Sequence, residues 1–363
     1  MKKRNWFRSI MAAVLTVSML GISACGVASQ PAQAPAAAPA ASSAEAAAPA
    51  APSAADGETY VIKYCHSQPE DHFTHLALLD MKAYIEEKSG GRLVLELFPN
   101  GQLGGDRQLI ESVQMGTLEM CNAVAASFSA SAPAAGVFDL PFLFASDEEA
   151  YKVLDGEVGQ AILEKINEQA NGYRVMTFGV SGLRHITNNV RPIHTPDDLK
   201  GLKIRTMENQ VHLDAFKLLG ANPTPMSIGE VFTALQQGTV DGQENPIGNI
   251  YGYKFNEVQK YLSMTAHVYQ PQFDVISTKF WDSLPDDLKT ILEEGEVLRR
   301  GKQREYAKEY EENALEEIKK TTEVNELTAE EMQLFRDACA PIYDKYKDQI
   351  GADVVDVVLE TIM

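Results

Sequence analysis

The order of apolar and polar residues changes repeatedly between two spacings along the chain. Residues 60–65 and 92–98 alternate as strands do, and residues 72–88 between them carry apolar side chains at helical spacing. A helix and then a strand follow in residues 106–124 and again in residues 156–180, with glycines near the helix ends. Alternation of this kind predicts an α/β fold with mainly parallel sheets and helices on both faces.

Helix-capping residues mark a second block of elements. Thr195 and Asp198 form a capping box, with Pro196 as the first helical residue. Ser227 and Glu230 form another capping box that opens a helix. The block also contains a strand, a helix and a second short strand, predicted at residues 202–206, 209–219 and 239–242.

Residues 285–321 predict one very long helix. After Pro285 they contain no proline and many good helix formers, and at 1.5 Å per residue the helix would be roughly 50 Å long. Because heptad spacing is not sustained, we expect a brace across two lobes rather than a coiled-coil arm. Thr328 and Glu331 then cap a C-terminal pair of helices.

The first residues of the chain have the order of a secretory signal peptide. Four cations precede a short apolar run at residues 10–22, and small residues lead to Cys25. Residues 22–25, Ile-Ser-Ala-Cys, resemble a lipobox, so we expect a lipoprotein signal peptide at residues 1–24 and a lipid anchor on Cys25. Ordinary cleavage in this alanine-rich stretch is the alternative. Residues 25–57, nearly all Ala, Pro, Ser and Gln, predict a disordered tether.

The rest of the chain exceeds the length of one average domain, roughly 150 residues, so we expect two lobes. We place lobe I at residues 58–181 and lobe II at residues 182–270. The chain then returns to lobe I and forms the brace helix at residues 271–310, and residues 311–363 form C-terminal helices on lobe II.

Charge and cysteine usage narrow the function. The formal net charge is -19, and an acidic surface argues against nucleic acid and anionic lipid as partners. Any site for an anion must therefore use local cations. We expect Cys65, Cys121 and Cys339 to be buried, unpaired thiols, with one disulfide among them as the alternative. Metal-ligand spacings and the common motifs of hydrolases and phosphate loops are absent from the sequence.

Polar residues at predicted strand ends are the candidate ligand-binding residues, because open parallel sheets bind ligands beyond the carboxyl ends of their strands. Arg184 follows the strand predicted to end near residue 180, Arg205 ends the strand at residues 202–206, and Asn245 follows the strand at residues 239–242. A guanidinium binds a carboxylate through two parallel hydrogen bonds, so these positions predict a carboxylate ligand.

Two histidines and one acidic residue complete the candidates. His66 follows the first strand and His267 lies in a strand that returns between the lobes, so both are candidates for lining the cleft, although a structural role is equally compatible. Glu208 has three candidate roles: it neutralises Arg205 in the empty site, accepts hydrogen bonds from ligand hydroxyls, or caps the following helix.

Six ordered motifs resemble those of the solute-binding subunits of TRAP transporters, the DctP-type receptors, and the resemblance covers essentially the whole chain after the tether. They are Gly-Ala-Asn-Pro-Thr-Pro-Met (220–226), Glu-Val-Phe-Thr-Ala-Leu-Gln-Gln-Gly (230–238), Asp-Gly-Gln-Glu-Asn-Pro (241–246), Phe-Pro-Asn-Gly-Gln-Leu-Gly (98–104), Phe-Asp-Leu-Pro-Phe (138–142) and Lys-Gly-Leu-Lys-Ile-Arg (200–205). The resemblance implies two α/β lobes of the periplasmic-binding-protein (Venus flytrap) type, which close around a ligand, and no enzymatic activity, cofactor or metal.

The same resemblance implies roles and partners. It places the salt bridge to the ligand carboxylate on Arg205, with Arg184 and Asn245 as companions. Integral-membrane TRAP subunits driven by an ion gradient are the implied partners, with the receptor outside the cytoplasm on the cell membrane. Glu208 favours a sugar acid, such as a uronate or aldonate, as the ligand. The alternatives are a C4-dicarboxylate receptor of the same family and a receptor that presents its ligand to a sensor kinase.

Overall fold

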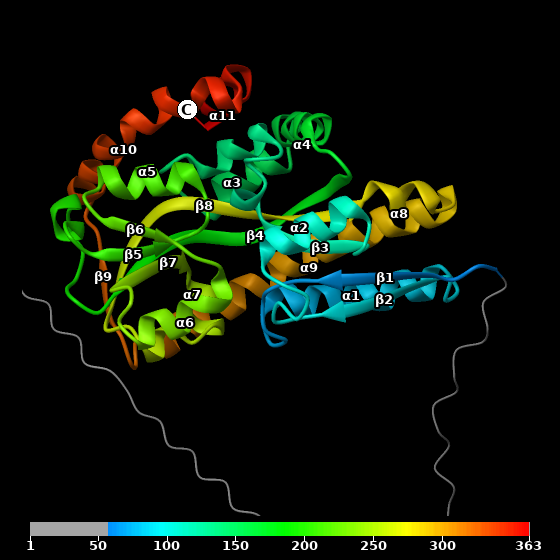
Figure 1. Ribbon diagram of the computed structural model, residues 1–363, viewed down its shortest axis with the longest axis horizontal. Helices are drawn as coiled ribbons and strands as arrows, with labels where there is room; N and C mark the ends of the chain where they lie inside the picture. The colour runs from blue at the N-terminus through cyan, green and yellow to red at the C-terminus, as the bar shows by residue number, and fades with distance from the viewer. Residues whose placement is uncertain (1–56, 363) are drawn as a thin grey trace, which may run out of the picture. The chain divides into compact units, whose positions relative to one another are not determined.

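One mixed sheet runs through residues 57–362, the part of the chain that the computed structural model describes (Figure 1). Its strands are β1 (Tyr60–Cys65), β2 (Leu93–Phe98), β3 (Met120–Val124), β4 (Tyr173–Asn188), β5 (Lys203–Thr206), β6 (Asn222–Pro225), β7 (Gly242–Pro246), β8 (Tyr261–Ser277) and β9 (Glu323–Glu326). They lie in the order β2-β1-β3-β8-β4-β7-β5-β6, and β9 pairs with β8. The signal peptide, Cys25 and the predicted tether lie outside the described residues.

The two ends of the sheet are parallel and its centre is antiparallel. The pairs β1–β2, β1–β3, β5–β6, β5–β7 and β8–β9 are parallel, whereas β8 pairs antiparallel with β3 and β4, and β4 with β7. The strands β4 and β8 have 16 and 17 residues and run between the two parallel ends. Register shifts interrupt their pairing near Val180 and Arg184, and such bulges bend a strand. The centre is thus a bent two-stranded ribbon.

Two predicted strand boundaries are wrong. The strand predicted to end near residue 180 continues to Asn188 in β4, because pairing with β8 and then β7 satisfies its backbone over the whole length. The strand predicted at residues 239–242 is β7, which begins at Gly242 and ends at Pro246. Consequently, Arg184 and Asn245 lie within strands and not after them.

The helices begin largely where their caps predict. They are α1 (Phe73–Lys88), α2 (Asp106–Met115), α3 (Asp147–Leu154), α4 (Glu157–Gln169), α5 (Gln210–Leu218), α6 (Ile228–Gln236), α7 (Ile247–Gly252), α8 (Thr278–Ser283), α9 (Asp286–Ile318), α10 (Ala329–Ile350) and α11 (Ala352–Ile362). Within residues 57–362 there are also four short 3₁₀ helices, η1 (Ala125–Ser127), η2 (Pro133–Asp139), η3 (Pro196–Leu199) and η4 (Phe255–Glu257). The capping boxes of Thr195 and Thr328 form as predicted, whereas the Ser227 side chain makes no capping hydrogen bond.

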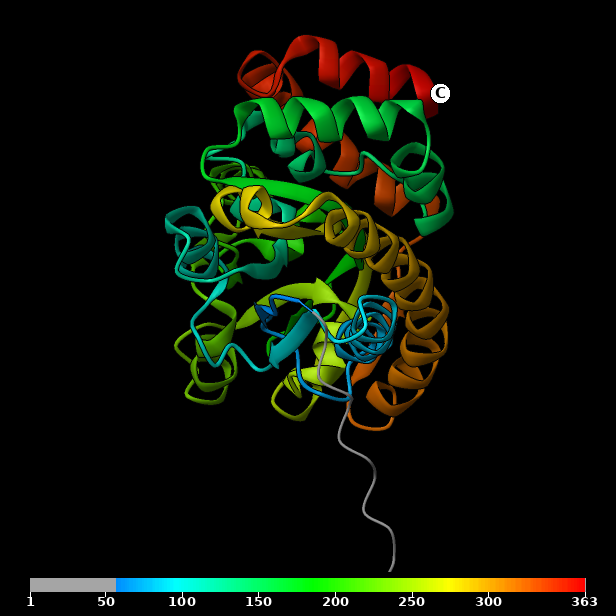
Figure 2. The ribbon, with the colours of Figure 1, turned by 90° about the vertical axis from the view of Figure 1, so that its right-hand side faces the viewer.

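The long helix α9 joins two apolar cores. Its first half contributes Leu288 and Leu292 to a core made with α1, β1 and β2, and its second half contributes Ala314 and Ile318 to a core made with α6, α7 and η4. The helix has 33 residues, about 50 Å at the standard rise, and runs along one side of the molecule (Figure 2). The prediction of a bracing helix is confirmed. A third core, with residues of α2, η2, α4, α5, α10 and α11, covers the other face of the sheet.

The three cysteines of the described region are buried and unpaired, as predicted: Cys65, Cys121 and Cys339. None of the helices within residues 57–362 combines the length and the apolar character that crossing a membrane requires.

Candidate ligand-binding site

A cavity of about 810 Å³ lies where the loops after several strands meet. Its wall comes from the loop after β1, the first turns of α2, the η1 segment, β4 at Arg184, the β5–α5 and β6–α6 connections, β7 at Asn245, and α10. These segments belong to both parallel ends of the sheet and to its centre. A molecule in the cavity would therefore contact elements that lie far apart in the sequence.

Three helices begin at the cavity wall. The first residues of α2, α5 and α6 all line the cavity, at Asp106, Gln210 and Ile228. The free N–H groups and the dipole at a helix N-terminus favour negative charge. This arrangement favours an anionic ligand.

Arg205 holds its charge in the cavity wall without a carboxylate partner among the described residues. Its side chain is 3% exposed, and Nε and Nη2 donate to the Met226 carbonyl at 3.0 and 2.7 Å. Nη1 is buried with no hydrogen-bond partner within residues 57–362. Burial lowers the pKa of Arg205 to about 10, although the charge of Glu244 opposes the shift. A ligand carboxylate at Nη1 would relieve this unfavourable burial.

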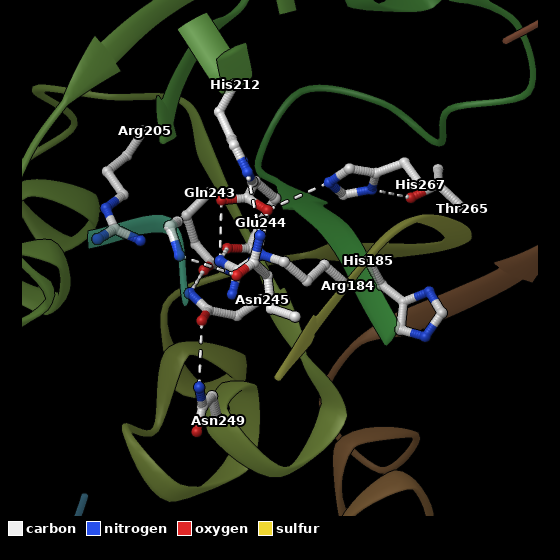
Figure 3. A network of polar contacts seen from close by, with 12 residues as sticks. Arg184, His185, Arg205, His212, Gln243, Glu244, Asn245, Asn249, Thr265 and His267 are labelled. Atoms are coloured by element: carbon white, nitrogen blue, oxygen red, sulfur yellow. Dashed lines mark hydrogen bonds and ion pairs between the residues drawn. The ribbon is translucent and has the colours of Figure 1, made fainter. Parts of the chain in front are cut away.

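Arg184 also lines the cavity, but its charge is neutralised by Glu244 (Figure 3). Nε donates to Glu244 Oε2, and Nη2 donates to Oε1 at 2.9 Å and to the Glu244 carbonyl at 2.6 Å. His267 Nε2 lies 3.1 Å from the same carboxylate. Burial alone would raise the pKa of Glu244, yet Arg184 and His267 hold it well below its usual range. Arg184 and Glu244 thus neutralise each other inside the protein.

Asn245 and Glu208 both line the cavity. Asn245 Nδ2 donates to Gln243 Oε1 at 2.5 Å, and Asn245 Oδ1 accepts from Asn249 at 3.3 Å. Glu208 is exposed. The residue that caps α5 is Asn209, whose Oδ1 accepts hydrogen bonds from the backbone amides of Val211 and His212. The alternative role of Glu208 as the cap is therefore wrong.

The two predicted histidines are absent from the cavity wall. His66 is fully buried, and its Nε2 lies 3.0 Å from Nδ1 of His75. The pKa of His66 is lowered to about 3, mainly by burial and secondly by the charge of the neighbouring His75. His267 is 3% exposed and lies beside Glu244, and its Nδ1 contacts the Thr265 hydroxyl at 2.8 Å. His66 follows β1 and His267 lies within β8, and both side chains contact neighbouring core residues instead of lining the cavity.

Sequence reasoning missed three polar groups of the cavity. Asp106 Oδ2 accepts from the Val124 amide at 3.2 Å, whereas its Oδ1 is buried without a partner among the described residues. Burial raises the pKa of Asp106. Gln68 Oε1 and the Tyr253 hydroxyl also lack a partner there. Asp106 lies at the start of a helix behind two glycines, and this position was the signal available in the sequence.

Comparison with known proteins identifies the family. The family model DctP, described as bacterial extracellular solute-binding protein, family 7, matches residues 64–349. The chain belongs to this family of solute-binding proteins. The family is one of extracytoplasmic binding proteins.

Three relatives illustrate the family. A solute-binding protein of Verminephrobacter eiseniae (strain EF01-2) is 43% identical over 201 residues, 55% of this chain and 59% of that protein. The C4-dicarboxylate-binding periplasmic protein DctP of Rhodobacter capsulatus is 34% identical over 83% of this chain and 90% of its own length. The crystal structure of the sugar acid binding protein DctPAm of Advenella mimigardefordensis strain DPN7T, in complex with galactonate, has a TM-score of 0.81 and 37% identity over 85% of this chain and 99% of that chain. The chain thus has the two-lobed α/β fold of this solute-binding family.

Proposed function

We propose that this chain is an extracytoplasmic receptor that binds a small organic carboxylate, preferentially a sugar acid, and delivers it to a TRAP-type transporter. The observation that carries the proposal is the buried guanidinium of Arg205, whose Nη1 has no partner in the described chain. A desolvated cation in a cavity wall is unfavourable until an anion arrives. A carboxylate supplies that anion and accepts a charge-assisted hydrogen bond.

The balance of charges in the cavity favours one carboxylate and several hydroxyls on the ligand. Arg184 is already neutralised by Glu244, so Arg205 is left as the buried cation for the ligand. The unpartnered oxygens of Asp106 and Gln68 accept hydrogen bonds, which ligand hydroxyls donate. A second carboxylate near Asp106 would meet charge repulsion in a partly desolvated cavity. The galactonate bound by the related sugar acid binding protein has this chemistry.

A C4-dicarboxylate is the second candidate ligand, and the relationship to the C4-dicarboxylate-binding protein of Rhodobacter capsulatus favours it. For this ligand, Arg107 of the cavity rim would have to hold the second carboxylate. Arg107 forms an exposed pair with Glu111, and exposed pairs contribute little, so the side chain is available.

We further propose that Cys25 carries a lipid anchor and that the lobes at residues 58–181 and 182–270 close over the ligand. The lipobox-like residues 22–25 and the short apolar run before them support the anchor. Closure follows from population shift, because a ligand held by walls from both ends of the sheet binds the closed form better than the open form. Replacement of Cys25 by serine should release the chain from membranes of the native cell, as fractionation would show.

A thermal-shift screen of residues 25–363, unfolded and refolded to remove bound ligand, tests the proposed function. Millimolar ligand on a micromolar site raises the free energy of unfolding by about 4 kcal/mol. We expect aldonates and uronates to raise the melting temperature by several degrees, and C4-dicarboxylates to have a much smaller effect. A shift with succinate or malate alone would replace the sugar acid by a dicarboxylate, and the absence of a shift with any acid would refute carboxylate binding.

A further inference from the structure

A fully buried carboxylate lies behind the cavity and belongs to none of the groups described above. Asp139 ends η2 and is 0% exposed. Its Oδ2 accepts from the Ser129 hydroxyl at 2.5 Å and from Asn209 Nδ2 at 2.7 Å. Its Oδ1 accepts from Gln270 Nε2 at 2.9 Å and lies 3.3 Å from His212 Nε2. Four side chains from three separate parts of the fold therefore converge on one carboxylate.

Two of these partners form the cavity wall. Ser129 follows η1, and Asn209 caps α5, and both line the cavity. Asn209 Nδ2 also donates to the Ala126 carbonyl at 2.9 Å, and the Ala126 amide donates to Gln270 Oε1 at 3.2 Å. The hydrogen bonds of Asp139 thus join a wall segment that follows β3 to a wall segment that follows β5.

The carboxylate also determines which way the Asn209 amide points. A carboxylate only accepts hydrogen bonds, so the NH₂ group of Asn209 must face Asp139. This leaves Asn209 Oδ1 toward α5, where it accepts from the amides of Val211 and His212 at 2.9 and 3.2 Å. An asparagine at position 139 would present its own NH₂ group to some of these donors. It would leave at least one buried donor unpaired.

We propose that Asp139 is a positioning residue of the ligand site: it fixes the Asn209 amide and the η1 segment in the orientation that binds the ligand. The proposal rests on the proposed function of the cavity. Asp139 acts through Asn209 and Ser129 and is not among the residues that line the cavity. Its sequence motif, Phe-Asp-Leu-Pro-Phe, thereby has a role in ligand binding as well as in the core.

Asp139→Asn tests the proposal, and Asp274→Asn is its matched control. Asp274 is also a fully buried carboxylate with hydrogen bonds to Tyr64, Asn122 and Arg299, but none of these residues lines the cavity. In residues 25–363, we expect Asp139→Asn to raise the Kd for galactonate, the probe acid, at least tenfold by titration calorimetry. Asp274→Asn should lower the melting temperature and leave the Kd within twofold.

Gln270→Leu provides a second measurement if Asp139→Asn fails to fold. Gln270 does not line the cavity, and the substitution removes one donor to Asp139 and the acceptor of the Ala126 amide. We expect Gln270→Leu to raise the Kd for galactonate at least threefold. A Gln270→Leu variant that folds and keeps the wild-type Kd would overturn the proposal.

Hydrogen exchange without ligand separates this inference from the identity of the ligand. In Asp139→Asn, we expect the amides of Val211 and His212 to exchange at least tenfold faster, whereas the amides at the start of α2 keep their rates. In Asp274→Asn, the amides of Val211 and His212 should be unchanged relative to global stability. Unchanged protection in Asp139→Asn overturns the positioning role, whatever the ligand. Faster exchange in a chain that binds no acid would support the positioning role and refute the proposed function.

Discussion

The two arginines of the cavity should respond in opposite directions to the same substitution. Arg205→Met keeps most of the side-chain volume and removes a buried charge that has no carboxylate partner among the described residues. The pKa of Arg205, lowered by burial from 12.5 to about 10, corresponds to roughly 3 kcal/mol of unfavourable environment for the charged form. Loss of the two donors to the Met226 carbonyl costs about 1–2 kcal/mol. We expect ligand-free Arg205→Met to be more stable than the wild type by about 1–2 kcal/mol.

Arg184→Met is the control, because Arg184 is paired with Glu244 and both side chains are fully buried. The substitution leaves Glu244 as a buried charge without its cation, and breaking such a pair costs about 3–5 kcal/mol. Thermal unfolding of ligand-free protein at neutral pH measures both variants. Arg205→Met should melt a few degrees higher than the wild type and show no shift with sugar acids, whereas Arg184→Met should melt markedly lower.

A lower melting temperature for ligand-free Arg205→Met would refute the reasoning, because it would show that the charge of Arg205 stabilises the fold. A ligand-induced shift retained in this variant would refute the assignment of Arg205 to the ligand carboxylate. The two readouts are independent, since the first needs no ligand.

Two other residues give testable expectations. Burial raises the pKa of Glu311 to about 8, and the charge of Asp147 adds to this shift, so the folded chain keeps a proton that the unfolded chain releases near pH 4.5. The free energy of unfolding should therefore fall as the pH rises from about 4.5 to about 8. Glu311→Gln should flatten this pH dependence of the melting temperature. Gly105 and Ser227 both line the cavity, and a Cβ added to Gly105 would lie 2.7 Å from the Ser227 hydroxyl. Gly105→Leu should therefore weaken ligand binding through faster dissociation, which stopped-flow experiments measure. Gly229→Leu, where a Cβ would meet nothing within 4 Å, should bind normally.

Local signals predicted the outer elements of the fold well. The helix α9 and the capping boxes at Thr195 and Thr328 follow from residues that are neighbours in the sequence. The central strands β4 and β8 are different, because they are buried on both faces and show no alternation that marks their ends. Their length is set by pairing with each other, which local sequence does not contain.

The candidate site shows the same division between local and distant information. Arg205, Arg184, Asn245 and Glu208 all line the cavity, although Arg184 and Asn245 lie within strands and not after them as the sequence predicted. The neutralisation of Arg184 depends on Glu244, which lies 60 residues away and approaches it by pairing of β4 with β7. Distinguishing a free arginine from a paired one therefore required the register of the sheet.

The path of the chain through its cores also determines when the molecule can fold during synthesis. The N-terminal strands β1 and β3 depend on β8, at Tyr261–Ser277, and on Leu288 and Leu292 of α9 to complete their sheet and core. A nascent chain that ends before β8 lacks these partners, and closing such distant contacts is slow. Most of the chain must therefore be synthesised before the N-terminal core can be completed, although that core begins with the first strand.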